Sequence, residues 1–397
     1  SPLTMNDFDD IRPYNDSEVP AALARLIADP ELMDVLLSRQ FPLLTKVVPD
    51  LFNFLARPFL SRSLLKLTRD VSTVSDFQEH MTKRLREVLD RTTDNYQFSG
   101  LDNLDSDRAY LFMSNHRDIA LDPALVNLGL SIAKRNTVRI AIGDNLLSKP
   151  FASDLMRVNR SFIVKRSVTG RRDKLEALKH LSCYIRYSLR TEEISIWIAQ
   201  AEGRAKNGCD RTETALLKML ALSKESDQSF AQATGELNII PVAISYEYDP
   251  CDADKACELY AQQEGISYTK DPFEDLDSIQ KGFVDYKGRI QITFGEPVTD
   301  KYENADLLAA EIDRQIHLYY QLFPTNIIAW KMHCSTVDKK TLDKLKSQWP
   351  DEDWTLAEDR FNSRINAMPL HHQAIAIAAY AAPVNSQLQY SMTGQES

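Results

Sequence analysis

The sequence contains no run of apolar residues long enough to cross a membrane. A spanning helix needs about 20 predominantly apolar residues, and no segment of this chain approaches that length without interruption. The opening residues also lack the positively charged and then apolar pattern of a secretory signal. We therefore expect a cytoplasmic protein that is neither secreted nor embedded in the bilayer.

Cysteine is scarce, and basic residues are outnumbered by acidic ones. The five cysteines form no C-x-x-C pair, which argues against a disulfide framework and against a zinc site. The 47 lysine and arginine residues face 57 acidic residues, giving a formal net charge of -10. Because phosphate neutralisation needs a basic face, this balance argues against a nucleic-acid partner.

Composition and length indicate a folded protein of more than one structural unit. Charged residues make up 26% and hydrophobic residues 43% of the 397 residues, a balance typical of globular proteins. Single hydrophobic cores rarely grow beyond about 250 to 300 residues. We therefore expect one domain of ordinary size together with substantial additions.

The spacing of apolar residues divides the chain into three predicted regions. Residues 5–100 show helical spacing that continues to Leu101, and residues 301–397 turn helical again before a polar tail after Ala382 that we expect to fray. Between them, residues 101–300 alternate short apolar runs with helical stretches, which indicates an α/β domain. Its predicted strands cover residues 110–114, 138–142, 162–165, 194–199, 239–246 and 290–294, and its clearest helices cover residues 174–189 and 212–223.

The N-terminal region contains an unusual segment, residues 41–67, which is crowded with leucine, valine and phenylalanine and broken by three prolines. Its charged side chains are mostly basic, with Asp50 against Lys46, Arg57, Arg62 and Lys66. A cationic and apolar helical stretch in an acidic protein is typical of partial insertion into an anionic membrane surface. Alternatively, these apolar side chains pack on the neighbouring domain and the basic residues form a solvated face.

The strongest local signal is the run Ser114-Asn115-His116-Arg117-Asp118-Ile119-Ala120-Leu121-Asp122-Pro123, which directly follows a predicted strand. Loops at strand ends carry much of the chemistry of α/β proteins. A histidine oriented by a carboxylate can take a proton from an alcohol near neutral pH. The run therefore predicts a general base, while the structural alternative makes Asp122 the N-cap and Pro123 the first residue of a helix.

The tripeptide His116-Arg117-Asp118 also occurs in protein kinase catalytic loops, but the rest of the sequence excludes a kinase. A kinase needs asparagine after four further residues, and Pro123 stands there. No Asp-Phe-Gly and no glycine-rich G-x-G-x-x-G loop occurs either.

Three further segments follow this run in order. Residues 160–167 form a predicted strand that ends in a basic pair, residues 201–208 form a flexible cationic turn after another strand, and residues 239–247 are an apolar run around Pro241. The residues of interest in the first two segments are Arg166, Glu202, Gly203, Arg204 and Lys206.

Together, the four segments resemble the four ordered motifs of the glycerol-3-phosphate and 1-acylglycerol-3-phosphate (lysophosphatidate) acyltransferase family, across roughly residues 110–248. The resemblance implies an α/β fold with a mixed sheet flanked by helices. It also implies transfer of a fatty acyl group from acyl-CoA or acyl carrier protein to a hydroxyl of glycerol 3-phosphate or lysophosphatidate in phospholipid synthesis. No cofactor and no metal is implied, and lipid substrates imply a peripheral location on the inner face of the cell membrane.

The resemblance also assigns roles to individual residues. His116 becomes the general base, and Asp122 or Asp118 orients its ring. The residues expected to bind the substrate phosphate are Arg166, Arg204 and Lys206. The residues expected to support the site are Asn115, Arg117, Glu202 and Gly203.

The sequence departs from the family pattern in two places. Five residues separate His116 from Asp122 where the family has four, and Asp118 follows His116 after one. We favour Asp122 as the partner, because a one-residue bulge in a loop costs little and a helix should begin at Asp122. In the third motif, Arg204 follows Gly203 directly, so that block is shortened.

Two other classes of function stay open at this point. A metal-dependent hydrolase would use His116, Asp118 and Asp122 as ligands of a divalent ion, but it leaves the later motifs unexplained. A non-catalytic lipid-binding scaffold on an acyltransferase domain is compatible with the irregular first and third motifs.

Overall fold

The computed structural model describes residues 1–271 and 273–393, which form two compact units. Unit 1 comprises Ser1–Arg84 and Arg139–Tyr184, and unit 2 comprises Leu85–Val138 and Ile185–Ser397. These units do not coincide with the three predicted regions. Part of the predicted α/β domain joins the N-terminal helices in unit 1, and the C-terminal helices share unit 2 with most of the strands.

Unit 1 combines the N-terminal helices with one parallel pair of strands. Prolines occupy the first turn of several helices, where their missing N–H group is not needed. Helix α7 connects β3 to β4 and packs against β4 and α1. The elements are η1 (Met5–Phe8), η2 (Asp16–Glu18), α1 (Val19–Ala28), α2 (Pro30–Gln40), α3 (Pro42–Val47), α4 (Pro49–Leu67), most of α5 (Val74–Thr92), β3 (Arg139–Gly143), η4 (Asp144–Leu146), α7 (Pro150–Val158), β4 (Ser161–Val164) and most of α8 (Arg171–Arg186).

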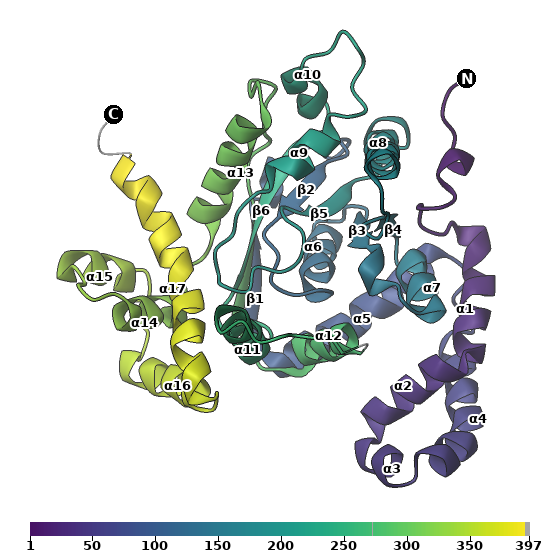
Figure 1. Ribbon diagram of the computed structural model, residues 1–397, viewed down its shortest axis with the longest axis horizontal. Coiled ribbons are helices and arrows are strands. Elements are labelled where there is room, and N and C mark those ends of the chain that lie inside the picture. The colour runs from purple at the N-terminus through teal and green to yellow at the C-terminus, as the bar shows by residue number, and fades with distance from the viewer. Residues whose placement is uncertain (272, 394–397) are drawn as a thin grey trace. The chain divides into compact units, whose positions relative to one another are not determined.

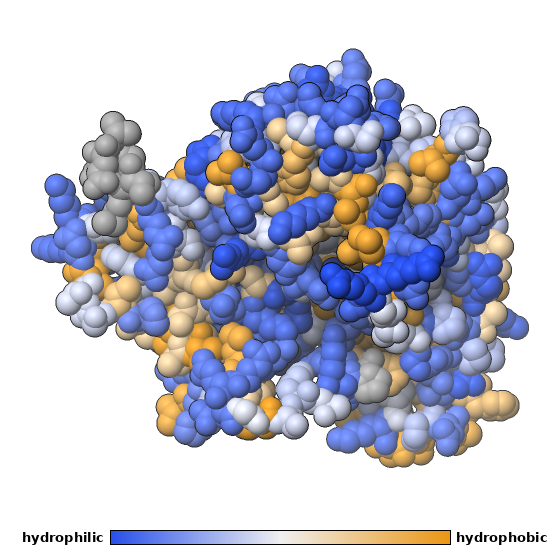
Figure 2. Space-filling view, turned by 45° about the horizontal axis from the view of Figure 1, so that its top comes forward, coloured by the Kyte–Doolittle hydropathy of each residue, from blue (hydrophilic) through white to orange (hydrophobic). Residues whose placement is uncertain are grey.

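Helices α2, α3 and α4 of unit 1 pack on one another (Figure 1), and their apolar side chains are largely exposed. No residue of α3 or α4 is buried, and Figure 2 shows apolar side chains at its lower right, where these helices lie. We call residues 36–67 the apolar segment. Its exposed apolar residues are Leu36, Phe41, Leu43, Leu44, Val47, Val48, Leu51, Phe54, Leu55, Phe59, Leu65 and Leu67. Within unit 1, these side chains are therefore not buried by the helices around them.

Unit 2 contains a mixed sheet, as predicted. Its strands follow the order β1-β7-β6-β2-β5, with β6 and β7 antiparallel and the other neighbours parallel. All eight residues of β6 are buried, as expected for a strand covered on both faces. The strands are β1 (Thr93–Ser99), β2 (Leu111–Ser114), β5 (Ile196–Ala199), β6 (Ile239–Tyr246) and β7 (Gly288–Phe294). With β3 and β4, every predicted strand is present.

Strand β1 corrects the prediction that helical structure continues to Leu101. Helix α5 ends at Thr92, and the chain enters β1 at the next residue. In β1, the inward residues Thr93, Tyr96 and Phe98 are half-buried among exposed polar neighbours, and the strand pairs with β7 along its length. Tertiary pairing with a distant strand therefore overrides the helical pattern of the preceding residues.

Helices surround this sheet in unit 2, and α13 lies beside β6 (Figure 1). Helix α17 continues through Pro383 to Thr393, so the fraying expected after Ala382 does not begin there, and residues 394–397 lie outside the described residues. The remaining elements are η3 (Leu101–Asn103), α6 (Leu121–Ile132), η5, a π-helical turn (Tyr187–Thr191), α9 (Thr214–Leu220), α10 (Phe230–Gly235), α11 (Asp252–Gln263), α12 (Glu274–Val284), α13 (Ala305–Tyr319), α14 (Pro324–His333), α15 (Lys339–Lys346), α16 (Trp354–Asn366) and α17 (Leu370–Thr393).

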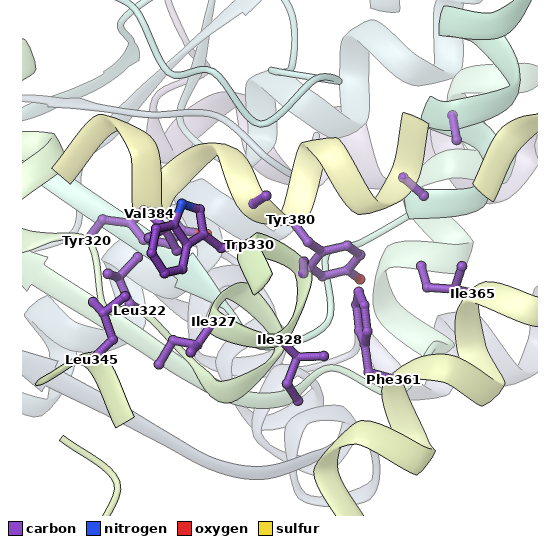
Figure 3. Close-up of a cluster of buried hydrophobic side chains, with 14 of the residues drawn as sticks. Tyr320, Leu322, Ile327, Ile328, Trp330, Leu345, Phe361, Ile365, Tyr380 and Val384 are labelled. Atoms are coloured by element: carbon purple, nitrogen blue, oxygen red, sulfur yellow. The ribbon is translucent and has the colours of Figure 1, made fainter. Parts of the chain in front are cut away.

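The C-terminal helices of unit 2 enclose a hydrophobic cluster of their own (Figure 3). The ring of Tyr380 on α17 meets the ring of Phe361 on α16 edge to face, with centroids 5.2 Å apart. Across residues 1–271 and 273–393, no helix has both the length and the apolar character needed to cross a membrane.

Candidate active site

A histidine and an aspartate form a buried pair in the loop between β2 and α6. His116 Nδ1 lies 2.8 Å from Asp122 Oδ2, and the aspartate is fully buried while the histidine side chain keeps 13% of its surface exposed. Asp122 sits in the first turn of α6, which turns its carboxylate back toward the loop. The geometry therefore pairs His116 with Asp122, the partner favoured from sequence.

The Asp122 carboxylate is held in its ionised form by four hydrogen bonds. Besides the His116 ring, the backbone N–H groups of Arg117 and Asp118 donate to Oδ2 at 2.6 and 3.0 Å, and the Tyr246 hydroxyl donates to Oδ1 at 2.6 Å. Burial alone would raise the pKa of Asp122, but the bonds and charge of His116 and the bonds from Tyr246 and Asp118 outweigh it, so its pKa lies below the ordinary value. An ionised Asp122 requires the His116 proton on Nδ1, which leaves Nε2 as an acceptor.

Asp118, the other candidate partner of His116, binds backbone N–H groups at the start of α6. Its Oδ1 accepts the backbone N–H groups of Ala120 and Leu121 at 3.2 and 2.7 Å, while its Oδ2 is buried without a hydrogen-bond partner. Helix α6 begins at Leu121 with Ala120 as N-cap. The alternative in which Asp122 is the N-cap is therefore wrong, and Asp118 supplies the side chain that binds the first N–H groups of the helix.

Burial of Asp118 gives a testable pH dependence of stability. Burial and then the charge of Asp122 raise the pKa of Asp118 to about 6, from 3.8. The folded protein thus binds more protons than the unfolded chain between these values, so this contribution to stability falls as the pH rises from about 4 to about 6. Since the substituted amide does not titrate, the free energy of unfolding of Asp118→Asn minus that of the parent should rise over this window, by at most about 3 kcal/mol. Urea denaturation of both proteins at pH 4, 5, 6 and 7 measures this difference in free energy of unfolding. A difference that does not vary with pH contradicts the prediction.

Asn115 and Arg117, the predicted supporting residues, fix the loop from both sides of the histidine. The Asn115 side chain exchanges two hydrogen bonds with the backbone of Ile244 on β6, accepting at 2.8 Å and donating at 2.9 Å. The buried Arg117 guanidinium donates to the Gly208 carbonyl and to Asp210 at 3.2 and 2.7 Å. Neither side chain is free to contact substrate, so both act on the position of the loop.

The His116 ring lines a cavity of about 480 Å³ together with the loop that follows β5. This loop contains the predicted residues Glu202, Gly203 and Arg204, and the backbone N–H of Ala205 donates to the His116 carbonyl at 2.9 Å. The structure thus brings the first and third motifs together around one cavity.

Two arginines of this cavity have no protein partner. Within the described part of the chain, the side chains of Arg204 and Arg211 make no hydrogen bond and no ion pair, although both line the cavity beside His116. Glu202, a predicted supporting residue, therefore forms no ion pair with Arg204 among the described residues. Arg211 was missed because it lies beyond the third motif, and only its basic character could have suggested it.

The same loop contains two backbone N–H groups without a partner in the described part of the chain. Gly203 adopts a φ of +76°, a conformation that side-chain-bearing residues rarely take. Among the described residues, neither its N–H nor that of Arg204 has a hydrogen-bond partner. Such N–H groups are suited to bind a developing negative charge on oxygen.

Trp197 on β5 is a further residue of the site that sequence reasoning missed. Its ring meets the His116 ring edge to face with centroids 5.5 Å apart, and its indole N–H donates to Ser114 Oγ at 2.9 Å. This contact limits rotation of the imidazole. Its place in an apolar strand run gave no signal of that role.

Residues 95–245 match the model of a family described as Acyltransferase. The chain carries an acyltransferase domain. The match spans β1 to β6 and includes His116, Asp122 and the cavity loop, and it ends before α11. No curated protein sequence matches the chain.

A solved structure similar to this chain is the 1-acyl-sn-glycerophosphate (LPA) acyltransferase PlsC from Thermotoga maritima. The two share 15% sequence identity with a TM-score of 0.36, and the alignment covers 81% of this chain and all of the other. A similarity of this size carries no inference about the present chain.

Of the two other predicted phosphate-binding residues, Lys206 does not line the His116 cavity of the acyltransferase domain, and Arg166 belongs to unit 1. Lys206 forms an ion pair with Glu258 at 2.5 Å and faces a second, strongly charged cavity of about 300 Å³. Arg166 follows β4 in unit 1, where its backbone N–H donates to Asp144 at 3.0 Å. Of the two predicted phosphate-binding residues in unit 2, Arg204 is the one that lines the cavity beside His116. The described residues contain no group of three or more His, Cys, Asp and Glu side chains arranged to hold a metal ion.

Proposed function

We propose that this chain is a glycerolipid O-acyltransferase in which His116 is the general base. One observation carries the proposal: the His116–Asp122 pair opens onto a cavity that also presents two unpartnered arginines, within a domain matched by the acyltransferase family. A base and a phosphate-binding surface in one cavity suit an acceptor that bears both a hydroxyl and a phosphate.

The proposed reaction moves the acyl group directly between two substrates. His116 Nε2 takes the proton of the acceptor hydroxyl as its oxygen attacks the thioester carbonyl carbon. Asp122 stabilises the imidazolium through Nδ1. The tetrahedral intermediate then expels the thiolate, which takes the proton from His116, and the ester is released without a covalent acyl-enzyme.

The negative charge on the carbonyl oxygen of the intermediate needs donors that are already in place. The unpaired N–H groups of Gly203 and Arg204 support this role, because they belong to the loop that lines the cavity beside His116. The guanidinium groups of Arg204 and Arg211 are proposed to bind the acceptor phosphate, whose oxygens match their planar donor geometry.

Acyl transfer from radiolabelled acyl-CoA and acyl carrier protein, each offered with glycerol 3-phosphate and with lysophosphatidate, tests the proposal. Product that forms with the parent and not with His116→Ala supports it, and the preferred pair names the donor and acceptor. Lipid binding without product from any pair favours a scaffold instead. Water-dependent release of fatty acid that requires an added divalent ion favours the hydrolase.

We further propose that the enzyme works at the surface of a membrane, peripherally on its cytoplasmic face, through the apolar segment. Phe54 and Phe59 on α4 are 71% and 72% exposed, far more than a soluble surface usually leaves of such rings. Lys46, Arg62 and Lys66 are exposed on the same segment. Exposed apolar side chains next to basic ones match a bilayer with anionic head groups.

The double variant Phe54→Ser/Phe59→Ser should bind anionic vesicles at least about tenfold more weakly than the parent, because each phenylalanine that enters the interface contributes on the order of 1 kcal/mol or more. Co-sedimentation with phosphatidylglycerol vesicles measures the change. Leu370→Ser is the matched control, since Leu370 on α17 is 77% exposed but lies outside the apolar segment. Equal losses in the two variants, or none in either, contradict docking by the apolar segment.

A further inference from the structure

Two consecutive peptide groups donate their N–H to Asp122. The carbonyl of each peptide group accepts a hydrogen bond from elsewhere in the protein. In the first peptide group, the His116 carbonyl accepts the Ala205 N–H at 2.9 Å while the Arg117 N–H donates to Asp122. A planar trans peptide directs its C=O and N–H in opposite directions. A bond at the carbonyl end therefore fixes where the N–H points.

The second peptide group, between Arg117 and Asp118, is held by a lysine. Lys255 Nζ on α11 donates to the Arg117 carbonyl at 2.7 Å, and the Asp118 N–H at the other end of the same peptide donates to Asp122 Oδ2 at 3.0 Å. The ammonium and the catalytic carboxylate thus bind opposite ends of a single peptide group.

We propose that Lys255 is a positioning residue of the acyl-transfer site, which fixes the Arg117–Asp118 peptide so that its N–H binds Asp122 and Asp122 in turn orients His116. The proposal rests on the proposed function, because it concerns the same histidine. Lys255 lies beyond residues 95–245, the part that matches the acyltransferase family, and no motif of the sequence points to it.

The surroundings of Lys255 hold its ammonium in one place. The residue is 2% exposed, and Asp249 Oδ2 accepts a second hydrogen bond from Nζ at 2.7 Å. Asp249 Oδ1 also lies 3.6 Å from Arg117 Nη1, so one carboxylate joins the two cations that flank the peptide. Buried charges with partners on several sides have little freedom to move.

Two tyrosines from the C-terminal part of unit 2 complete this network. The Tyr320 ring lies under the Arg117 guanidinium, with 5.4 Å between the guanidinium carbon and the ring centroid, and the Tyr380 hydroxyl accepts the Asp249 N–H at 2.8 Å. The cavity that Lys255 lines with these tyrosines has a volume of about 10 Å³. This is about the room for one water molecule, so no substrate fits beside Lys255 in this cavity. Lys255 also lies on the wall of the second, strongly charged cavity.

Loss of the ammonium should act on catalysis and leave substrate binding intact. In Lys255→Met, the Arg117 carbonyl loses its partner, the Asp118 N–H is free to turn away, and Asp122 keeps fewer donors. Misplacement of a catalytic group by about 1 Å costs on the order of 10²-fold in rate. We expect a fall of that order in kcat with KM close to the parent value.

The matched control is Lys281→Met. Lys281 on α12 also forms an ion pair, with Asp254 at 2.7 Å, but its side chain is 49% exposed. Among the described residues, it makes no hydrogen bond and no ion pair with the His116 loop. A second readout is hydrogen–deuterium exchange of the amides at residues 116–118, which should speed up in Lys255→Met and stay unchanged in Lys281→Met.

A double variant separates positioning from simple charge balance. Removal of one partner of a buried ion pair destabilises a protein, whereas removal of both is often tolerated. Lys255→Met/Asp249→Asn should therefore fold even where the single variant does not, and its kcat should stay low. Recovery of kcat in the double variant, or a kcat of Lys255→Met equal to that of Lys281→Met, overturns the proposal. Absence of any transfer by the parent overturns the proposed function instead, and the exchange comparison then decides the role of Lys255 by itself.

Discussion

Asp122→Asn should lower kcat for acyl transfer by about 10³- to 10⁴-fold, a loss similar to that of His116→Ala. The carboxylate accepts from the His116 ring and from the N–H groups of Arg117 and Asp118 on one oxygen. An asparagine whose oxygen takes the place of Oδ2 can still accept these three bonds, but it carries no charge, and its amide nitrogen cannot accept the Tyr246 hydroxyl as Oδ1 does. The imidazolium that forms in the reaction then lacks its counter-ion.

Asp118→Asn is the matched control for this variant, because it removes a carboxylate from the same loop without touching the histidine. The substituted side chain keeps an oxygen that accepts the N–H groups at the start of α6, as Asp118 Oδ1 does, and asparagine serves such positions about as well as aspartate. The kcat of this control should stay near that of the parent. Equal losses in the two variants would mean that His116 does not depend on Asp122. Initial rates at saturating donor and acceptor give the comparison.

The second large effect is expected from Arg204→Ala/Arg211→Ala, which should lower kcat/KM for a phosphate-bearing acceptor by about 10³-fold. Each guanidinium that binds a phosphate through charged hydrogen bonds contributes about 1.5 to 3 kcal/mol. Neither arginine has to leave a protein partner to do so, since both are unpaired in the described part of the chain. The single variants should each lose about 10- to 100-fold.

An acceptor without phosphate distinguishes phosphate binding from general damage to the site. Monoacylglycerol offers the same hydroxyl to His116, so its slow acylation should be nearly equal in the parent and the double variant. Arg204→Lys and Arg211→Lys should recover part of the loss, because lysine keeps the charge but not the planar pair of donors. If the double variant slows both acceptors equally, the arginines do not bind the phosphate.

The predicted strands could be recognised because a buried strand has a local pattern of apolar residues. Strand β6 is apolar except for Ser245 and β7 alternates, and both patterns can be read from local sequence. Strand β1 has no such signal: its residues are mostly polar, it follows α5 without a break, and its pairing with β7 depends on residues far along the chain. The division into units was also beyond local reading, because residues 139–184 join the N-terminal helices through tertiary contacts.

The residues of the candidate site also include some that could be predicted from the sequence and some that could not. His116, Asp122 and Arg204 lie in short motifs whose residue types suggest their chemistry. In the structure, His116 and Arg204 line one cavity, and Asp122 is hydrogen-bonded to His116. Arg211 and Lys255 lie outside those motifs. Arg211 is important because its guanidinium has no partner in the described part of the chain, and Lys255 because its ammonium binds the Arg117 carbonyl. Neither property is visible in a sequence.

The pairing of β1 with β7 also affects how the chain is made. Ser99 and Gln291 are joined by a hydrogen bond although they stand 192 positions apart. A ribosome that adds about 5 to 20 residues per second needs roughly 10 to 40 s to travel that distance. Throughout this interval β1 has left the ribosome with its backbone groups unpaired, which exposes the nascent chain to association with other strands.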